Sequence, residues 1–184
     1  MNSITKKGLF CHVSHGYLVV LLAVAGWLPL RGQTHNWQWS RSMASSANEM
    51  YREVAIDRTT GSIYAIGEAE NTGGLLGTLL GALNLVNADQ AFLVKYSESG
   101  AVLWTAAIGG TDKETGDDVA VGANGTIYIT GLFRGTCLFY HAGGTVAAGS
   151  LVGAGNYDVY VAAYSPNGNF LWARSVGNSN MEQY

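Results

Sequence analysis

Apolar residues along this chain fall into short runs separated by polar turns, and this pattern predicts strands rather than helices. From residue 34 onward the runs are rich in Val, Ile, Tyr, Phe and Trp, while Gly and Asn fill the breaks. Such a composition is typical of β-strands joined by tight turns. Helical periodicity of apolar positions is absent here. The expected strands include residues 54–57, 63–67, 91–96, 102–104, 119–122, 127–131, 159–164 and 170–172.

One phrase within this pattern occurs twice. Residues 96–104 read Tyr-Ser-Glu-Ser-Gly-Ala-Val-Leu-Trp, and residues 164–172 read Tyr-Ser-Pro-Asn-Gly-Asn-Phe-Leu-Trp. Each copy holds a strand end, a polar turn with Gly and a second strand ending in Trp, which predicts a β-hairpin. Because the hairpin recurs, the sequence indicates a repeat protein.

The repeat extends to whole units marked by Trp39, Trp104 and Trp172, which are 65 and 68 residues apart. Each unit holds about four expected strands, the number found in a β-propeller blade. We therefore predict an all-β fold of β-propeller-type repeats with about four antiparallel strands each. Two units cover about 39–104 and 104–172, and a third starts at 172–184. The central strand of each unit should be almost wholly apolar, because both of its faces would meet neighbouring blades.

The stretch between the second and third strands differs between the two units. It covers residues 71–83 in the first unit and 134–144 in the second, and each is predicted to hold one strand and a long loop. Variable inserts in repeat arrays tend to lie on one face, often the binding face. A variable loop without a ligand is the alternative, because loops tolerate change.

The first residues are typical of a secretory signal peptide. Lys6 and Lys7 precede an apolar run at 18–30, which is shorter than the ~20 residues needed to span a bilayer. We predict a signal peptide over 1–33, cleaved near Gly32 and Gln33, and an incomplete β-propeller repeat domain over 34–184. An uncleaved membrane anchor is the alternative.

Charge and cysteine content narrow the range of partners. The chain has 10 Lys and Arg against 13 Asp and Glu, and Lys6, Lys7 and Arg31 lie in the predicted leader. The acidic remainder argues against a nucleic-acid partner and, after signal cleavage, against an anionic membrane. Cys137 is the one cysteine that follows the leader, so an internal disulfide is excluded there. It is expected to be a small buried apolar residue.

The end of the sequence aligns with the first unit. Residues 172–175 match residues 39–42 at an offset of 133, which places Glu182 on Glu49 and Tyr184 on Tyr51. The sequence therefore stops just before the next expected strand of a third unit. We expect a piece of a longer reading frame or a truncated product. Its partners would be further blades or copies of itself, because a repeat cannot bury its faces alone.

Several phrases resemble a known repeat. Residues 158–164 (D-V-Y-V-A-A-Y) and 168–175 (G-N-F-L-W-A-R-S) look like the SBBP-type β-propeller repeat of secreted bacterial proteins. Residues 118–121, 125–131 and 133–136 fit the same pattern. The resemblance covers the chain from about residue 37 and is stronger in the second unit. It implies a secreted or cell-surface bacterial propeller, and it brings no shared catalytic residues.

The residues themselves offer no specific catalytic constellation. His35 and His141 follow the leader in unrelated contexts, and no paired-His or Cys-x-x-Cys spacing exists there. We therefore assign no catalytic, cofactor-binding or metal-ligating residue, and we expect no cofactor. Acidic residues do cluster at 112–118, where Lys113 lies among them. This loop is interpreted as a solvated turn, with a Ca²⁺ site as the alternative, because its spacing is not that of an EF-hand.

The recurring tryptophans also allow two interpretations. Aromatic faces can stack on sugar rings, but Trp39, Trp104 and Trp172 return at one position of the unit. Recurrence favours packing between blades, where large aromatics contribute most burial.

These observations predict an exported, non-catalytic β-propeller segment that serves as a binding or structural scaffold at the cell surface. Its candidate ligands are a protein or a carbohydrate. Two alternatives stay open: part of a propeller enzyme whose active site lies in further blades, and a non-functional truncated remnant with aggregating strand edges.

Overall fold

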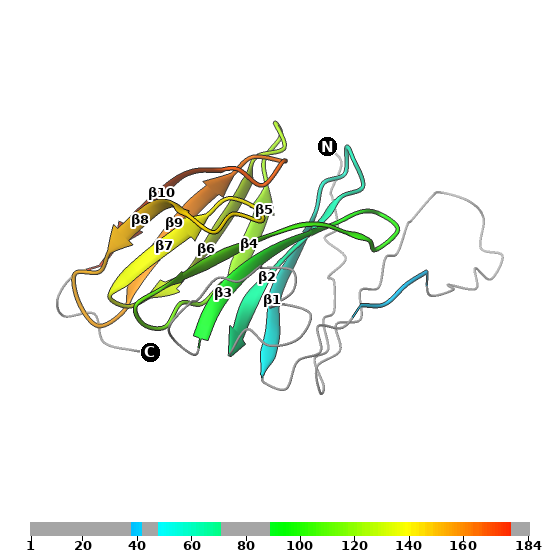
Figure 1. Cartoon of the computed structure of the whole chain (residues 1–184). Helices are drawn as coiled ribbons and strands as arrows, with labels where there is room; N and C mark the ends of the chain where they lie inside the picture. The colour runs from blue at the N-terminus through cyan, green and yellow to red at the C-terminus, as the bar shows by residue number, and fades with distance from the viewer. Residues whose placement is uncertain (1–37, 42–47, 71–88, 178–184) are drawn as a thin grey trace, which may run out of the picture.

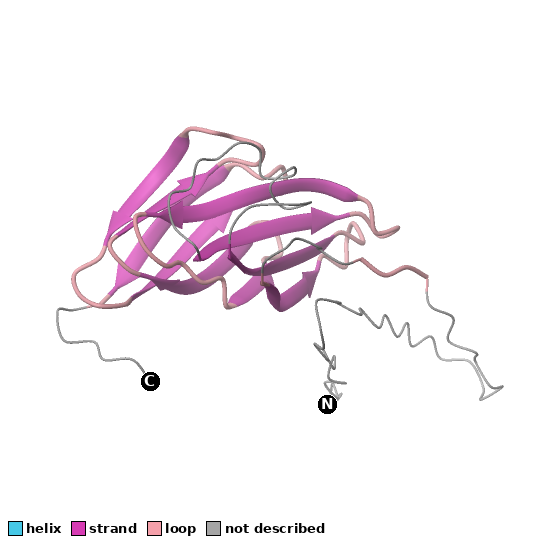
Figure 2. Cartoon of the chain, turned by 60° about the horizontal axis from the view of Figure 1, so that its bottom comes forward, coloured by secondary structure: helices cyan, strands magenta, loops and turns pink. Residues whose placement is uncertain are grey.

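The computed structural model describes residues 38–41, 48–70 and 89–177, and all regular structure in these ranges is strand (Figure 2). This confirms the predicted all-β fold. The strands are β1 (Glu49–Ile56), β2 (Ile63–Glu70), β3 (Asp89–Tyr96), β4 (Val102–Gly110), β5 (Asp118–Val121), β6 (Ile127–Phe133), β7 (Thr136–Tyr140), β8 (Ala147–Val152), β9 (Asp158–Tyr164) and β10 (Phe170–Val176). Within the described ranges, no helix is long and apolar enough to cross a membrane.

Two four-stranded antiparallel arrays form the framework of the molecule (Figure 1). The first blade has the order β1-β2-β3-β4, and the second has the order β5-β6-β9-β10. Each array comes from one sequence repeat, so the expectation of about four strands per unit is correct. The two repeated phrases form the β3–β4 and β9–β10 hairpins, as predicted.

Residues 134–144 hold one strand, β7, and the start of the loop that follows it, as predicted. The prediction missed the next strand, β8, which completes a hairpin with β7. Strands β7 and β8 pair with each other, and β7 then joins the sheet of the first blade. It pairs with the far end of β4, Ile108 opposite Phe139 and Gly110 opposite Cys137. The free edge of β4 thereby gains a partner, which removes an exposed set of backbone groups. The first insert, 71–83, lies outside the described residues.

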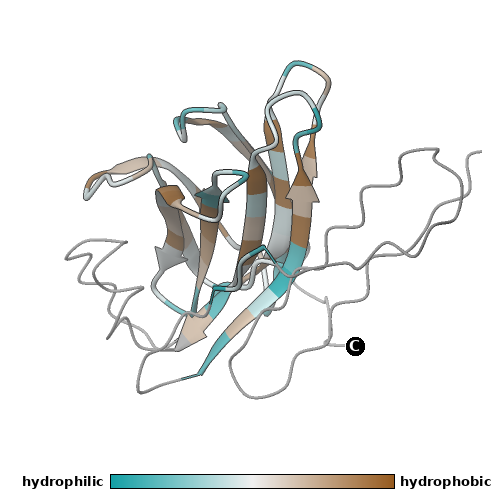
Figure 3. Ribbon diagram, turned by 90° about the vertical axis from the view of Figure 1, so that its right-hand side faces the viewer, coloured by the Kyte–Doolittle hydropathy of each residue, from teal (hydrophilic) through white to brown (hydrophobic). Residues whose placement is uncertain are grey.

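The hairpin turns gather at one end of the blades, because the strand before each turn runs in the same direction. We call this end the turn edge; it comprises the turns at 57–62, 97–101, 122–126, 141–146 and 165–169. Gly100 and Gly168 have φ values of 80° and 81°, a region that glycine enters without steric cost. In both turns the glycine N–H bonds to the carbonyl of the Ser three residues earlier. Figure 3 shows apolar segments mainly along the strands and polar ones in many turns.

The apolar core lies between the two blades and on the outer face of the first. In the first blade, the central strand is buried on both faces, and Ala91, Phe92, Leu93 and Val94 have no exposed surface. In the second blade, burial alternates along β6, and Tyr128 is 38% exposed. The expectation of a doubly buried central strand thus holds for the first blade and is wrong for the second, one face of which has no neighbouring blade among the described residues.

Candidate functional site

A polar hollow of about 530 Å³ lies at the turn edge of the first blade. The β1–β2 turn and the β3–β4 turn form its walls, and the segment before the first blade adds one amide. Four of its side chains carry hydroxyl groups and one carries a carboxylate. The lining residues are Gln38, Thr60, Ser62, Ser97, Glu98, Ser99 and Leu103.

Local hydrogen bonds fix the walls of this hollow. Asp57 begins the first turn, and its carboxylate accepts hydrogen bonds from Thr60 Oγ1 at 2.7 Å and from the Thr59 N–H at 2.8 Å. These bonds favour the ionised form and hold the pKa of Asp57 below its usual value. In the second turn the Ser97 and Ser99 hydroxyls lie 2.9 Å apart. Local hydrogen bonds therefore orient the hydroxyl groups of Thr60, Ser97 and Ser99 around the hollow, and Glu98 adds one carboxylate.

Two of the tryptophans that mark the repeat contact the turns that contain Ser-x-x-Gly: Trp39 contacts the turn at 97–101, and Trp104 contacts the turn at 165–169. Trp39 donates its indole N–H to the carbonyl of Glu98 at 2.8 Å, and Trp104 donates to the carbonyl of Pro166 at 3.1 Å. In each case the accepting residue lies two positions before the turn glycine. Both glycines are buried under the indoles, with no room for a side chain. The predicted packing between blades is confirmed for Trp104. Trp39 packs instead on the outer face of the first blade, and Trp172 is 40% exposed.

The carbonyl of the turn glycine also has a donor in both units, but the donors differ. Arg41 Nε donates to the Gly100 carbonyl at 2.8 Å, whereas the Ala142 N–H donates to the Gly168 carbonyl at 2.9 Å. Ala142 lies in the turn of the β7–β8 hairpin. Sequence analysis did not find the role of Arg41, although the shared Trp-x-Arg spacing at 39–41 and 172–174 was its signal.

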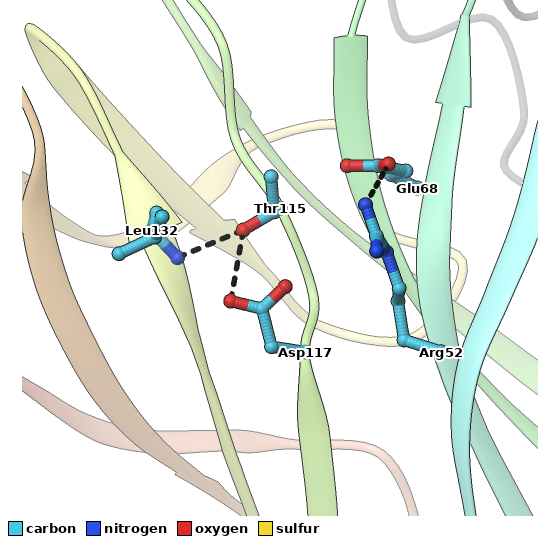
Figure 4. A network of polar contacts seen from close by, with 5 residues as sticks. All are labelled: Arg52, Glu68, Thr115, Asp117 and Leu132. Carbon is cyan, nitrogen blue, oxygen red and sulfur yellow. Dashed lines mark hydrogen bonds and ion pairs between the residues drawn. The ribbon is translucent and has the colours of Figure 1, made fainter. Parts of the chain in front are cut away.

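The acidic loop at 112–118 is not simply a solvated turn, and that interpretation is wrong in its middle. Glu114 has no exposed surface and Thr115 is 7% exposed, because this stretch runs between the two blades. Figure 4 shows Thr115 Oγ1 accepting the Leu132 N–H at 3.0 Å and donating to Asp117. The ion pair between Arg52 and Glu68 lies nearby on the first blade.

The carboxylates of this loop do not converge on a common point. Asp112 pairs with Arg134 at 3.1 Å, and Asp117 bonds to Thr115. Within the part of the chain that the structure describes, no group of three or more His, Cys, Asp or Glu residues could hold a metal ion.

Among the described carboxyl groups, Glu114 has the most strongly shifted pKa. Its Oε2 accepts the Gly110 N–H at 3.0 Å, and its Oε1 is buried without a hydrogen-bond partner. Burial is the main cause that raises the pKa of Glu114 to about 8, and Asp112 adds to the rise. A pKa near 8 favours the protonated, uncharged form of Glu114 at pH 7, which suits a carboxyl group placed between two sheets.

The other two residues that the sequence analysis considered, Cys137 and His141, contact the rest of the fold. Cys137 is buried in the core between the blades, as predicted. His141 Nδ1 accepts the Phe170 N–H at 2.9 Å, which ties the tip of the β7–β8 hairpin to β10. His35, Glu182 and Tyr184 lie outside the described residues.

No family model matches the chain. It is 30% identical over 157 residues to an uncharacterised WD repeat-containing protein of Acanthamoeba polyphaga mimivirus. The matched region is 78% of this chain, and the chain spans about a tenth of that relative, 11% of its length. The likeness points to a β-propeller-like repeat family. This agrees with the stacked four-stranded blades.

Proposed function

We propose that this protein is an exported β-propeller scaffold that binds a protein partner through the polar hollow at the turn edge of its first blade. The observation that carries the proposal is the arrangement of the hollow itself. Two hairpin turns, each with its own hydrogen bonds, present hydroxyl and carboxylate groups around a hollow of about 530 Å³. Rigid turns on stacked blades offer a preformed site, and binding to a preformed site costs little conformational entropy.

The chemistry of the lining favours a basic protein loop over a sugar. Sugar sites rely on an aromatic face for stacking, and the side chains that line the hollow include no aromatic ring. The carboxylate of Glu98 lines the hollow, and Asp57 lies behind Thr60. A Lys or Arg side chain of the partner would complement this negative charge.

A panning experiment tests this site. A display library of short cyclic peptides is selected on the full chain and then compared on the Ser99→Arg and Glu98→Lys variants. We expect peptides rich in Lys or Arg that bind the original chain and lose binding to both variants. Ser150→Arg is the matched control, because this residue lies on β8, outside the hollow. Equal binding to all four proteins, or selection of no peptide, contradicts the proposal.

The proposal places this scaffold outside the cytoplasm, as an SBBP-type bacterial protein. Support comes from Lys6 and Lys7 before the apolar run at 18–30 and from the SBBP-like phrases at 158–164 and 168–175. Fusion of residues 1–33 to a reporter that is active only after export measures this directly. We expect export to be lost when an Arg replaces Leu22 in the centre of the apolar run. A reporter that stays inactive behind the unaltered leader contradicts the placement.

A further inference from the structure

An aromatic pair occurs twice in the same geometry, covered in one blade and open in the other. Tyr64 and Trp104 of the first blade have ring centroids 6.0 Å apart at an angle of 54°. Tyr128 and Trp172 of the second blade have centroids 6.3 Å apart at 53°. Tyr64 is 1% exposed beneath the second blade, whereas Tyr128 is 38% and Trp172 is 40% exposed. The second blade therefore presents the same contact surface that the first blade uses to hold its neighbour.

The residues that cover the first pair show what this surface holds. The turn at 165–169 lies against Trp104, with the Pro166 carbonyl on the indole N–H at 3.1 Å and Gly168 against the indole ring. Trp39 holds the turn at 97–101 in the same way, through the Glu98 carbonyl and Gly100. Both occupants are Ser-x-x-Gly turns with the glycine at positive φ. In both instances, therefore, the tryptophan at this position of the unit contacts a Ser-x-x-Gly turn.

In each contact a second group donates a hydrogen bond to the carbonyl of the turn glycine. The sequence indicates which residue can do so at the open surface of the second blade. The residue two positions after the tryptophan is Arg41 in the first instance, and its Nε donates to the glycine carbonyl. It is Ala106 in the second, where the Ala142 N–H donates instead. At the open surface it is Arg174, an exposed residue on β10. Residues two apart on a strand point to the same face, so Trp172 and Arg174 present both donors together.

We propose that Trp172 and Arg174 dock the Ser-x-x-Gly hairpin turn of a further repeat unit. The Trp172 indole N–H bonds to the carbonyl two residues before the turn glycine, and the Arg174 guanidinium bonds to the carbonyl of that glycine. Tyr128 and Val161, which is 40% exposed, pack against the body of the incoming unit.

The occupant is a further unit and not a second copy of the described blades. Both Ser-x-x-Gly turns in the described residues are already covered, one by Trp39 and one by Trp104. A second copy would have to release one of these contacts to offer its turn. The match covers 11% of the mimivirus relative, so a protein of that length has room for further repeat units.

The test extends the full chain in register. Because Tyr184 aligns with Tyr51, residues 52–110 are appended directly after Tyr184, which brings a copy of the turn at 97–101 to the spacing that it has from Trp39. Melting temperatures are measured for the original and for the extended chain, each unaltered and with Trp172→Phe, Arg174→Ala or Leu171→Ala. Leu171 is the matched control, because it is 50% exposed and its side chain carries no hydrogen-bond donor for the turn.

We expect Trp172→Phe and Arg174→Ala to lower the melting temperature of the extended chain and to leave that of the original chain nearly unchanged. Leu171→Ala should have the same small effect in both. The indole N–H resonance of Trp172, assigned by its loss in Trp172→Phe, should gain protection from solvent exchange in the extended chain. Equal effects in both chains, or an indole that stays exposed in a folded extended chain, overturn the proposal.

A second measurement decides the matter if the appended unit does not fold. A hairpin peptide with the sequence of residues 164–172, closed by a disulfide between two cysteines added at its ends, is titrated into the original chain. The same peptide with Gly168→Ala is the matched control. The Trp172 indole resonance should move with the first peptide only, because a methyl group on the turn glycine would meet the indole. No movement, equal movement with both peptides, or a dimer of the original chain that covers Trp172 overturns the proposal.

Discussion

Gly116 of the second blade lies directly against Ile66 of the first. A methyl group on Gly116 would lie 2.5 Å from Cγ1 of Ile66, a side chain with no exposed surface. At this one position the loop between β4 and β5 can therefore pass Ile66 only without a side chain. Close approach of this kind is a role that glycine alone can fill, because any side chain would push the blades apart.

Gly116→Ala should destabilise the protein by about 1–3 kcal/mol, the usual cost of overpacking a core. Ile66→Ala alone should cost about 2–5 kcal/mol, because it leaves a cavity. The double variant should cost less than the two single variants together, since the new methyl group enters the space that Ile66 leaves. Chemical denaturation of the four proteins measures this coupling, and strictly additive losses would show that the two residues are not in contact.

Gly168→Ala should be more damaging than Gly143→Ala, although both glycines have positive φ values, 81° and 65°. Alanine at either position carries the backbone cost of a left-handed conformation, about 1–2 kcal/mol. At Gly168 the methyl group would also meet Trp104 and Ala142, whereas nothing lies within 4 Å at Gly143. The difference in the free energy of unfolding between the two variants measures the close contacts of Gly168 with Ala142 and Trp104. Similar losses would argue against it.

The stability of the protein should fall as the pH rises from about 4.5 towards 8, because of Glu114. The folded state raises the pKa of this carboxyl from 4.5 to about 8, so between these values the folded protein holds a proton that the unfolded chain releases. The contribution is complete below pH 4.5, and its loss has a limiting slope of about 1.4 kcal/mol per pH unit.

Glu114→Gln should remove this slope and make the protein relatively more stable at pH 8, since the amide oxygen can still accept the Gly110 N–H. Denaturant titrations at pH 5, 6.5 and 8 test the prediction. Glu98→Gln, a change at an exposed carboxylate, should keep the original slope. If the Glu114→Gln and original proteins show the same pH profile, Glu114 is ionised in the folded state.

Cys137 should resist thiol reagents while the protein is folded. Its side chain has no exposed surface, and burial raises the pKa of the thiol well above its usual value. The reactive thiolate is therefore scarce and inaccessible. In a Cys11→Ser background, Ellman's reagent at pH 8 should report almost no thiol until denaturant is added and one thiol per chain afterwards. Rapid reaction of the native protein would place Cys137 at the surface.

The local parts of this structure could be predicted from sequence. The phrases at 96–104 and 164–172 specify their hairpins through a Ser, a Gly and flanking β-branched or aromatic residues, all within one turn. The recurrence of Trp39 and Trp104 likewise led to their packing role. In both cases the signal and the structure involve neighbouring residues or a repeated spacing, which a single sequence displays directly.

The parts that depend on distant segments could not be predicted in this way. The pairing of β7 with β4 joins residues of different repeats, and nothing in the residues at 134–144 specifies which edge they will meet. The burial of Glu114 follows from the packing of one blade on the other, while its sequence context is that of an exposed acidic turn. The polar hollow arises because two separate turns lie side by side at the turn edge.

The β7–β8 hairpin sets the order in which the molecule can be completed. Its residues follow β6 of the second blade, yet they form the outer strands of the first sheet. As the ribosome delivers the chain from its N-terminus, the first sheet stays unfinished until Val152 has emerged, by which point half of the second blade has been made. The unit of folding is therefore the pair of blades, and a nascent chain that pauses after β4 exposes the strand edge that this hairpin later covers.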